Sequence, residues 1–97
     1  MYARIVTVQI KPEMFEEATA IYRNSIIPAA KLQPGSVSMM LLGDQISGNA
    51  QSISTWETEA YEKASATNGY LQQQFAKLGA MFASPPTHAA YEVWVQS

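Results

Sequence analysis

Cysteine is absent from the sequence, and histidine occurs once, as His88. Without cysteine the chain has no disulfide, no thiol nucleophile and no thiolate metal ligand. A single histidine cannot by itself build the histidine-rich sites that hold zinc or copper. We therefore expect no thiolate or histidine-rich metal site.

Charged side chains are also scarce. They make up 14% of the residues, against about 25% in an average protein. Six basic and eight acidic residues give a formal charge of −2, and the basic residues form no cluster. Because nucleic-acid binding depends on clustered positive charge, we expect no nucleic-acid partner.

Long apolar runs are missing as well. No run approaches the roughly 20 residues that span a bilayer, and Arg4 interrupts the first apolar stretch, so no signal-peptide core is visible. We expect a cytoplasmic protein that does not contact a membrane. With 97 residues, 47% of them hydrophobic, the chain fits a single domain, 1–97, whose small core leaves apolar surface for a partner.

Alternation of apolar and polar residues predicts four strands separated by turn residues. The expected strands are residues 2–10, 37–42, 51–56 and 89–95, and the second of them is apolar on both faces. Residues 43–49 contain the Gly, Asp and Asn of a hairpin loop. They lack the glycine spacing of a phosphate-binding loop, so we interpret them as a hairpin.

Two helices are expected between these strands. Pro12 suits the first position of a helix, and apolar residues recur at helical spacing as far as Pro28, which should bend or end this helix. Thr58 is the expected N-cap of the second helix, and Asn68-Gly69 should break or kink it. The acidic residues around this second start are interpreted as charges that complement the helix end: Glu57, Glu59 and Glu62.

The order strand-helix-strand-strand-helix-strand is that of the ferredoxin-like α+β fold, in which helices cover one face of a four-stranded antiparallel sheet. The other face would carry Ile5 and Thr7 with one of two rows of the second strand, either Val37-Met39-Leu41 or Met40-Leu42. A monomer should not leave such an apolar face in water. We therefore predict a homodimer whose two sheets pack face to face as a dimeric α+β barrel.

Five short segments, in their order and spacing, resemble the antibiotic biosynthesis monooxygenase (ABM) family of the dimeric α+β barrel superfamily. They are Ile10-Lys11-Pro12, Leu32-Gln33-Pro34-Gly35, Leu41-Leu42-Gly43-Asp44, Ile53-Ser54-Thr55-Trp56-Glu57-Thr58 and Tyr91-Glu92-Val93. The resemblance covers nearly the whole chain. It implies a dimer with a small pocket between sheet and helices in each subunit.

Some members of this family oxidise quinols, anthrones or polycyclic phenols with dioxygen and without metal or flavin. The resemblance therefore implies a cofactor-independent monooxygenase acting on a small aromatic substrate. The substrate would supply the electrons, while the protein binds it, favours its deprotonation and excludes water. The alternatives are a non-catalytic dimer that binds a small hydrophobic ligand or has a stress-related role, and an isomerase or lyase on the same scaffold.

The resemblance also implies candidate site residues. Trp56 matches the family's tryptophan at the end of the third strand, and we interpret it either as a pocket wall or as a packing residue whose N–H makes a local hydrogen bond. Tyr61 and His88 are the other catalytic candidates, the histidine as a base. The candidate substrate-binding residues are Ser52, Tyr70, Gln74, Phe75 and Tyr22. Ser52 stands where the phenol-oxidising members have an amide.

Several of these residues also have a structural interpretation. His88 near a strand start is typical of a surface residue, and Tyr22 and Phe75 fall on apolar helical stripes typical of a core. Haem degradation is not expected. The first strand has Val6 and Val8 where haem-degrading members have an asparagine, and the second helix has no histidine to ligate iron.

Overall fold

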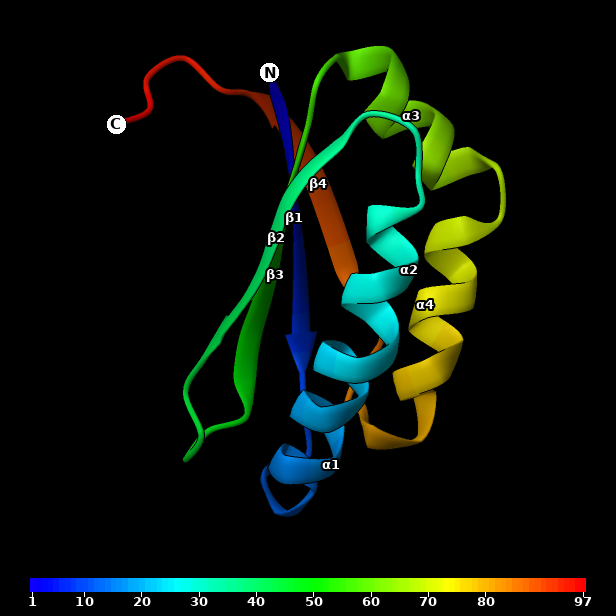
Figure 1. The fold of residues 1–97 in the computed structure, drawn as a ribbon. Helices are drawn as coiled ribbons and strands as arrows, with labels where there is room; N and C mark the ends of the chain where they lie inside the picture. Colours follow the sequence, from blue (N-terminus) through cyan, green and yellow to red (C-terminus); the bar gives the residue numbers. More distant parts are fainter.

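The first strand, β1 (Tyr2–Gln9), buries every second side chain, because one row of residues faces the helices and the other does not. In the computed structural model, which describes residues 1–97, the strand order is β2-β3-β1-β4 (Figure 1) and all pairs are antiparallel. The other strands are β2 (Ser36–Gly43), β3 (Asn49–Trp56) and β4 (Thr87–Glu92). The predicted ferredoxin-like α+β fold is confirmed.

The first helical region is longer than predicted. It runs through a 3-10 turn (Pro12–Met14), α1 (Phe15–Ile21), a π-helical turn (Tyr22–Ile26) and α2 (Ile27–Lys31). Pro28 lies at the start of α2 and the helix continues to Lys31, so of the two predicted outcomes, a bend or an end, the end is wrong. The wider π turn directly before it removes the usual conflict between a proline ring and the preceding helical turn.

The second helical region is divided as predicted. Thr58 caps α3 (Glu59–Thr67), since its Oγ1 accepts a hydrogen bond from the backbone N–H of Tyr61 at 3.2 Å. Gly69, with φ of 94°, then separates α3 from α4 (Tyr70–Leu78). Only glycine adopts this conformation readily, which explains the break. A 3-10 turn (Gly79–Met81) follows α4.

The sheet register decides which row of β2 faces away from the helices. Met40 is aligned with Ile53, and Ile53 with Ile5. Aligned residues of neighbouring strands point to the same face, so Met40 and Leu42 belong to the open face. Met39 and Leu41, which belong to the other row, pack against the core instead. Of the two rows that the sequence left open, Met40-Leu42 is therefore the exposed one.

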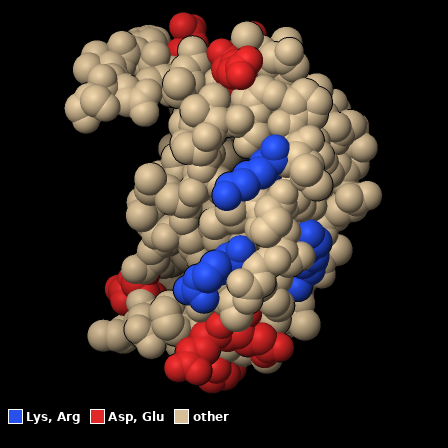
Figure 2. Space-filling model, in the orientation of Figure 1, with Lys and Arg blue, Asp and Glu red and all other residues tan.

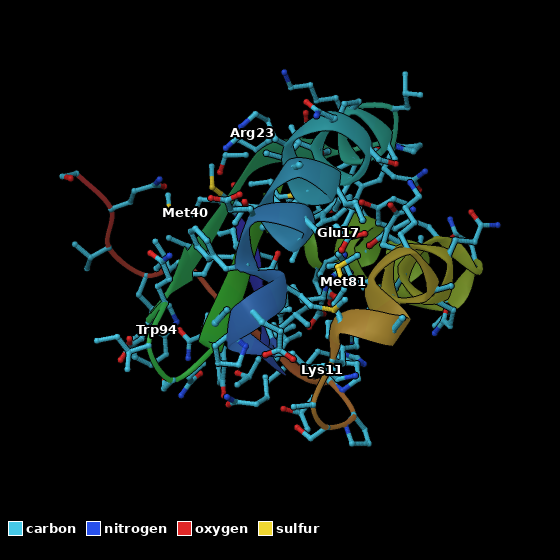
Figure 3. The ribbon with its side chains drawn as sticks, turned by 90° about the horizontal axis from the view of Figure 1, so that it is seen from below. Lys11, Glu17, Arg23, Met40, Met81 and Trp94 are labelled. Carbon is cyan, nitrogen blue, oxygen red and sulfur yellow. The ribbon has the colours of Figure 1, made fainter.

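This open face is apolar and uncovered in the single chain. Met40 and Leu42 keep 51% and 48% of their surface exposed. Figure 3 shows Met40 and Trp94 on the side of the sheet away from the helices. In Figure 2, charged residues are few across the view, and acidic ones gather at the lower end, where Glu13, Glu16 and Glu17 begin the first helical region.

The fourth strand was predicted at residues 89–95, but it begins two residues earlier and ends three residues earlier. It begins at Thr87, which pairs with Thr7, and ends at Glu92, which pairs with Tyr2. Because β1 begins at Tyr2, the sheet offers the chain no further partner strand. The C-terminal segment then leaves the sheet (Figure 1), and Trp94 is 86% exposed.

The core lies between the sheet and the helices. It comprises thirteen buried hydrophobic residues, and the largest fully buried side chains are Trp56 and Arg4. A buried arginine is unusual and requires partners. None of the helices is both long enough and apolar enough to cross a bilayer.

Candidate functional site

A cavity of about 50 Å³ lies between the sheet and the helices. Thirteen of its seventeen lining residues are hydrophobic. On β1 the lining residues are Arg4, Val6, Val8 and, just beyond the strand, Ile10. Strand residues advance about 3.3 Å each, so the cavity extends along most of the strand. Its lining is apolar near Ile10 and more polar near Arg4.

A larger groove adjoins the apolar end of this cavity. It measures about 340 Å³ and shares Ile10, Ala18 and Leu41 with the cavity. Its other lining residues come from the start of the first helical region and from the β2–β3 hairpin. Figure 1 shows α1 and the tip of this hairpin at the same end of the molecule. Three shared residues therefore separate the groove from the cavity at this end of the molecule.

Two tyrosines contribute hydroxyl groups to the cavity lining. The Tyr22 hydroxyl is hydrogen bonded to Ser52 Oγ at 2.8 Å. Burial raises the pKa of Tyr22 to about 12, although the Ser52 hydrogen bond partly opposes this rise. Burial also raises the pKa of Tyr70, and the positive charge of Arg4 partly opposes it. Both hydroxyls are therefore protonated at neutral pH and can donate hydrogen bonds.

Arg4 forms the polar end of the cavity and is held by three partners. One terminal nitrogen, Nη1, donates to Glu62 Oε2 at 3.2 Å and to Ser65 Oγ at 2.8 Å. The guanidinium carbon lies 5.1 Å from the centre of the Trp56 ring, within the range of a cation–π contact. Arg4 and Glu62 are both almost fully buried, so their charges compensate each other inside the protein.

Two buried atoms beside the cavity have no hydrogen-bond partner within the protein. They are Arg4 Nε and the hydroxyl oxygen of Tyr70. Arg4 is 1% exposed and Tyr70 is 5% exposed, and both residues line the cavity. Buried polar groups are rarely left unpaired, since an unmade hydrogen bond costs about 1–3 kcal/mol.

The five candidate substrate-binding residues all come together in the cavity lining. Ser52 belongs to β3, Tyr22 to the π-helical turn, and the remaining three, Tyr70, Gln74 and Phe75, to α4. Both polar atoms of the Gln74 side-chain amide form hydrogen bonds. It donates to the Tyr70 carbonyl oxygen at 3.4 Å and accepts from Lys77 Nζ at 2.9 Å.

The three candidate catalytic residues do not line the cavity. Trp56 is buried behind Arg4, and its indole N–H donates to Ser54 Oγ at 3.0 Å, which is the local hydrogen bond of the packing interpretation. Tyr61 is 41% exposed and its ring lies over the backbone at Gly35. His88 is exposed on β4, with its ring centre 6.4 Å from that of Phe75.

Sequence reasoning missed the roles of Arg4 and Glu62. Glu59 and Glu62 both lie in the first turn of α3, as predicted. Glu59 is exposed and pairs with Lys63 at 3.6 Å, whereas the carboxylate of Glu62 is buried against Arg4, a pairing that was not predicted. One signal was present in the sequence. Arg4 falls in the same alternating row as Val6 and Val8, and a charge in a buried row needs a buried partner.

Comparisons with known proteins give the fold a wider context. The sequence matches no protein-family model, and a search of curated proteins gives no match. Solved structures do match over nearly the whole chain. One, an antibiotic biosynthesis monooxygenase, is 19% identical with a TM-score of 0.74, and the match covers 96% of this chain and 98% of that one. The chain has the ABM fold. The resemblance drawn from the sequence is thus confirmed for the fold.

Two further structures support the same assignment. SnoaB from Streptomyces nogalater, a cofactor-independent oxygenase, is 19% identical with a TM-score of 0.69, and the match covers 98% of this chain and 94% of that one. A protein of unknown function from Nitrosomonas europaea is 22% identical with a TM-score of 0.76, and the match covers 99% of this chain and 91% of that one. Proteins with this ABM fold therefore include an oxygenase that needs no cofactor.

No group of three or more His, Cys, Asp or Glu side chains is arranged as a set of metal ligands. The cavity lining contains neither a carboxylate nor an imidazole. Besides its apolar wall, the lining contains two protonated phenols, one guanidinium, the amide of Gln74 and two serine hydroxyls. This combination can bind a flat apolar molecule and donate hydrogen bonds to it.

Proposed function

We propose that the protein is a cofactor-independent monooxygenase that oxidises a small aromatic, quinol or polycyclic phenol substrate with dioxygen. The observation that carries this proposal is the buried apolar cavity with hydroxyl and guanidinium donors at one end. The ABM fold and its occurrence in a cofactor-independent oxygenase agree with it. Ser52, Tyr70, Gln74, Phe75 and Tyr22 would bind the substrate.

The chemistry needs no external electron donor. An anthrone-type substrate loses a proton to give a delocalised anion, which transfers electrons to dioxygen. In balanced form, the CH2 group and O2 give a C=O group and H2O, so the carbon is oxidised and both oxygen atoms are reduced. The protein's contribution is to hold the substrate, to exclude water and to donate hydrogen bonds to the oxygen where negative charge develops.

Substrate size sets a further condition. The cavity of about 50 Å³ is smaller than the roughly 150 Å³ that accommodates benzene in an engineered apolar cavity. The adjoining groove supplies the missing space if Ile10 and Leu41, which line both, move apart. We therefore expect the substrate to occupy the cavity and part of the groove.

Catalytic roles for Trp56, Tyr61 and His88 stay predictions, because none of the three lines the cavity. The absence of a carboxylate or imidazole from the lining favours substrates that ionise easily, such as quinols and anthrones. It also favours the second candidate function, a dimer that binds a small hydrophobic ligand without reaction.

We also propose that two copies pack through their open sheet faces. Ile5, Ile53 and Met40 form an aligned row across three strands on that face. A second copy offers the same apolar row, so the pairing would remove both from water. The tail with Trp94 leaves the sheet beside this face and would gain cover from the partner (Figure 3).

Oxygen uptake tests the oxidation. An oxygen electrode would follow the purified protein with a panel of quinols and anthrones, and we expect one O2 consumed per product formed, above the rate without protein. If no substrate raises oxygen uptake while an aromatic ligand still raises the melting temperature, the protein is the binding dimer and not an oxygenase.

A further inference from the structure

One end of the cavity contains buried polar groups that have no partner. Tyr70 is almost fully buried, its hydroxyl has no partner within the protein, and the residue lines the cavity. The Nε atom of Arg4, at the same cavity, is also without a partner. The influence of the Arg4 charge on the pKa of Tyr70 agrees with the two groups lying near each other.

We propose that Arg4 Nε and the Tyr70 hydroxyl form a binding site for one oxygen atom of the ligand. The inference rests on the proposed function for the identity of the cavity as the substrate site. Arginine can only donate, and a protonated tyrosine hydroxyl donates as well, so the atom that fits between them is a hydrogen-bond acceptor.

The charge balance of the site selects the kind of oxygen. Glu62 already neutralises Arg4 through the 3.2 Å contact, and Ser65 accepts from the same nitrogen. A carboxylate or phosphate would bring a localised, uncompensated charge into the cavity on binding, which is strongly unfavourable, whereas the anion of the proposed oxidation forms from a ligand that binds neutral and its charge is delocalised. A neutral carbonyl oxygen carries no such penalty. Because a carbonyl oxygen only accepts hydrogen bonds whereas a phenol oxygen also carries a proton that would need an acceptor, the ligand class that fits is a flat aromatic ketone, rather than an aromatic acid or a bare hydrocarbon.

The anchoring of Arg4 makes the site rigid. The guanidinium is held by Glu62 and Ser65 on one nitrogen and by the Trp56 ring on its face. Trp56 is in turn fixed by its hydrogen bond to Ser54. Nε therefore keeps its position without the ligand, so little ordering accompanies binding. In this arrangement Trp56 acts as a positioning residue.

Another cavity hydroxyl provides a matched control. Tyr22 also lines the cavity, but its hydroxyl is already hydrogen bonded to Ser52 at 2.8 Å. Removing the Tyr22 hydroxyl should therefore affect a ligand oxygen much less than removing the Tyr70 hydroxyl. Both changes, Tyr22→Phe and Tyr70→Phe, delete one oxygen atom and keep the ring, so both variants should fold.

The test uses three ligands that share one bicyclic skeleton: 1-tetralone, tetralin, and tetralin-1-carboxylate. Dissociation constants are measured by calorimetry in buffer without oxygen, so the result does not depend on any oxidation. We expect 1-tetralone to bind more tightly than the other two ligands. Tyr70→Phe should weaken 1-tetralone binding about 3- to 10-fold, change the dissociation constant of tetralin by no more than about twofold, and not lower the melting temperature. Tyr22→Phe should leave the preference for the ketone intact.

Four results would overturn the inference: equal binding of 1-tetralone and tetralin, preference for the carboxylate, an equal effect of Tyr70→Phe on 1-tetralone and tetralin, or no binding of any of the three. Equal binding would mean that the two donors are satisfied by water. Failure of the oxygen-uptake assay together with ketone-selective binding would instead refute the oxygenase and leave this oxygen site standing.

Discussion

The buried Arg4–Glu62 pair allows a sharp prediction about stability. The substitution Glu62→Gln keeps the shape of the side chain but removes its charge, leaving the guanidinium of Arg4 uncompensated at 1% exposure. Removing one partner of a buried ion pair typically costs about 3–5 kcal/mol. Because glutamine can still accept a hydrogen bond from Arg4, we expect the lower end of this range, about 3 kcal/mol.

The matched control is Glu59→Gln on the same helix. Glu59 also pairs with a basic residue, Lys63 at 3.6 Å, but both side chains are more than half exposed. Such exposed pairs four residues apart contribute about 0.3–0.5 kcal/mol. The loss of unfolding free energy should therefore be several-fold larger for Glu62→Gln than for Glu59→Gln, because only Glu62 is buried.

Urea unfolding at one fixed protein concentration measures both variants, since the stability of an oligomer depends on concentration. For a chain of this size 1 kcal/mol corresponds to about 4–8 °C in melting temperature, so Glu62→Gln should lower it by roughly 12–24 °C. If Glu62→Gln unfolds within about 1 kcal/mol of the wild type, the buried pair is not the structural anchor that its geometry indicates.

The remaining predictions concern the open face, the tryptophan and the tyrosine pKa. If the protein forms the proposed dimer, Met40→Glu should convert it to a monomer at micromolar concentration in light scattering, because the substitution buries a charge in the apolar row. Gln72→Glu on the exposed face of α4 should not have this effect, and a dimer that persists in Met40→Glu would exclude this interface. Trp56→Ala should destabilise the fold by about 3–5 kcal/mol in urea unfolding, and a smaller loss would contradict its packing role. Burial raises the pKa of Tyr22 from 10.0 to about 12, so the stabilising contribution of its protonated hydroxyl is complete below pH 10 and is lost as the pH rises towards 12. The wild type should therefore lose more stability than Tyr22→Phe between pH 10 and pH 12. Equal losses would refute the burial of this hydroxyl.

Much of the fold was visible in the sequence because it follows from short-range patterns. The alternation in residues 2–10 predicts β1, Thr58 predicts the cap of α3, and Asn68-Gly69 predicts the break before α4. Each of these signals depends only on residues close together in the chain. That the helix continues past Pro28 was not predicted, because the π turn before it has no comparable sequence signature.

The limits of the sheet and the candidate site depend on distant residues and were less accessible. Where β4 ends is decided by where β1 begins, through the pairing of Glu92 with Tyr2. The partner of Arg4 is Glu62, fifty-eight positions later, and nothing near either residue indicates the other. Ser52 and Tyr70 became candidates through the resemblance to the ABM family, whereas the unpartnered Tyr70 hydroxyl was visible only in the packed structure.

The central claim is that the cavity oxidises an aromatic substrate with dioxygen and no cofactor. The most direct test incubates the metal-free, flavin-free protein with an anthrone under 18O2 and analyses the product at once by mass spectrometry. The account predicts one 18O atom in the new carbonyl group, formed faster than without protein, and none when the label is in water. Product formed at the same rate without protein, or labelled only from water, would contradict it.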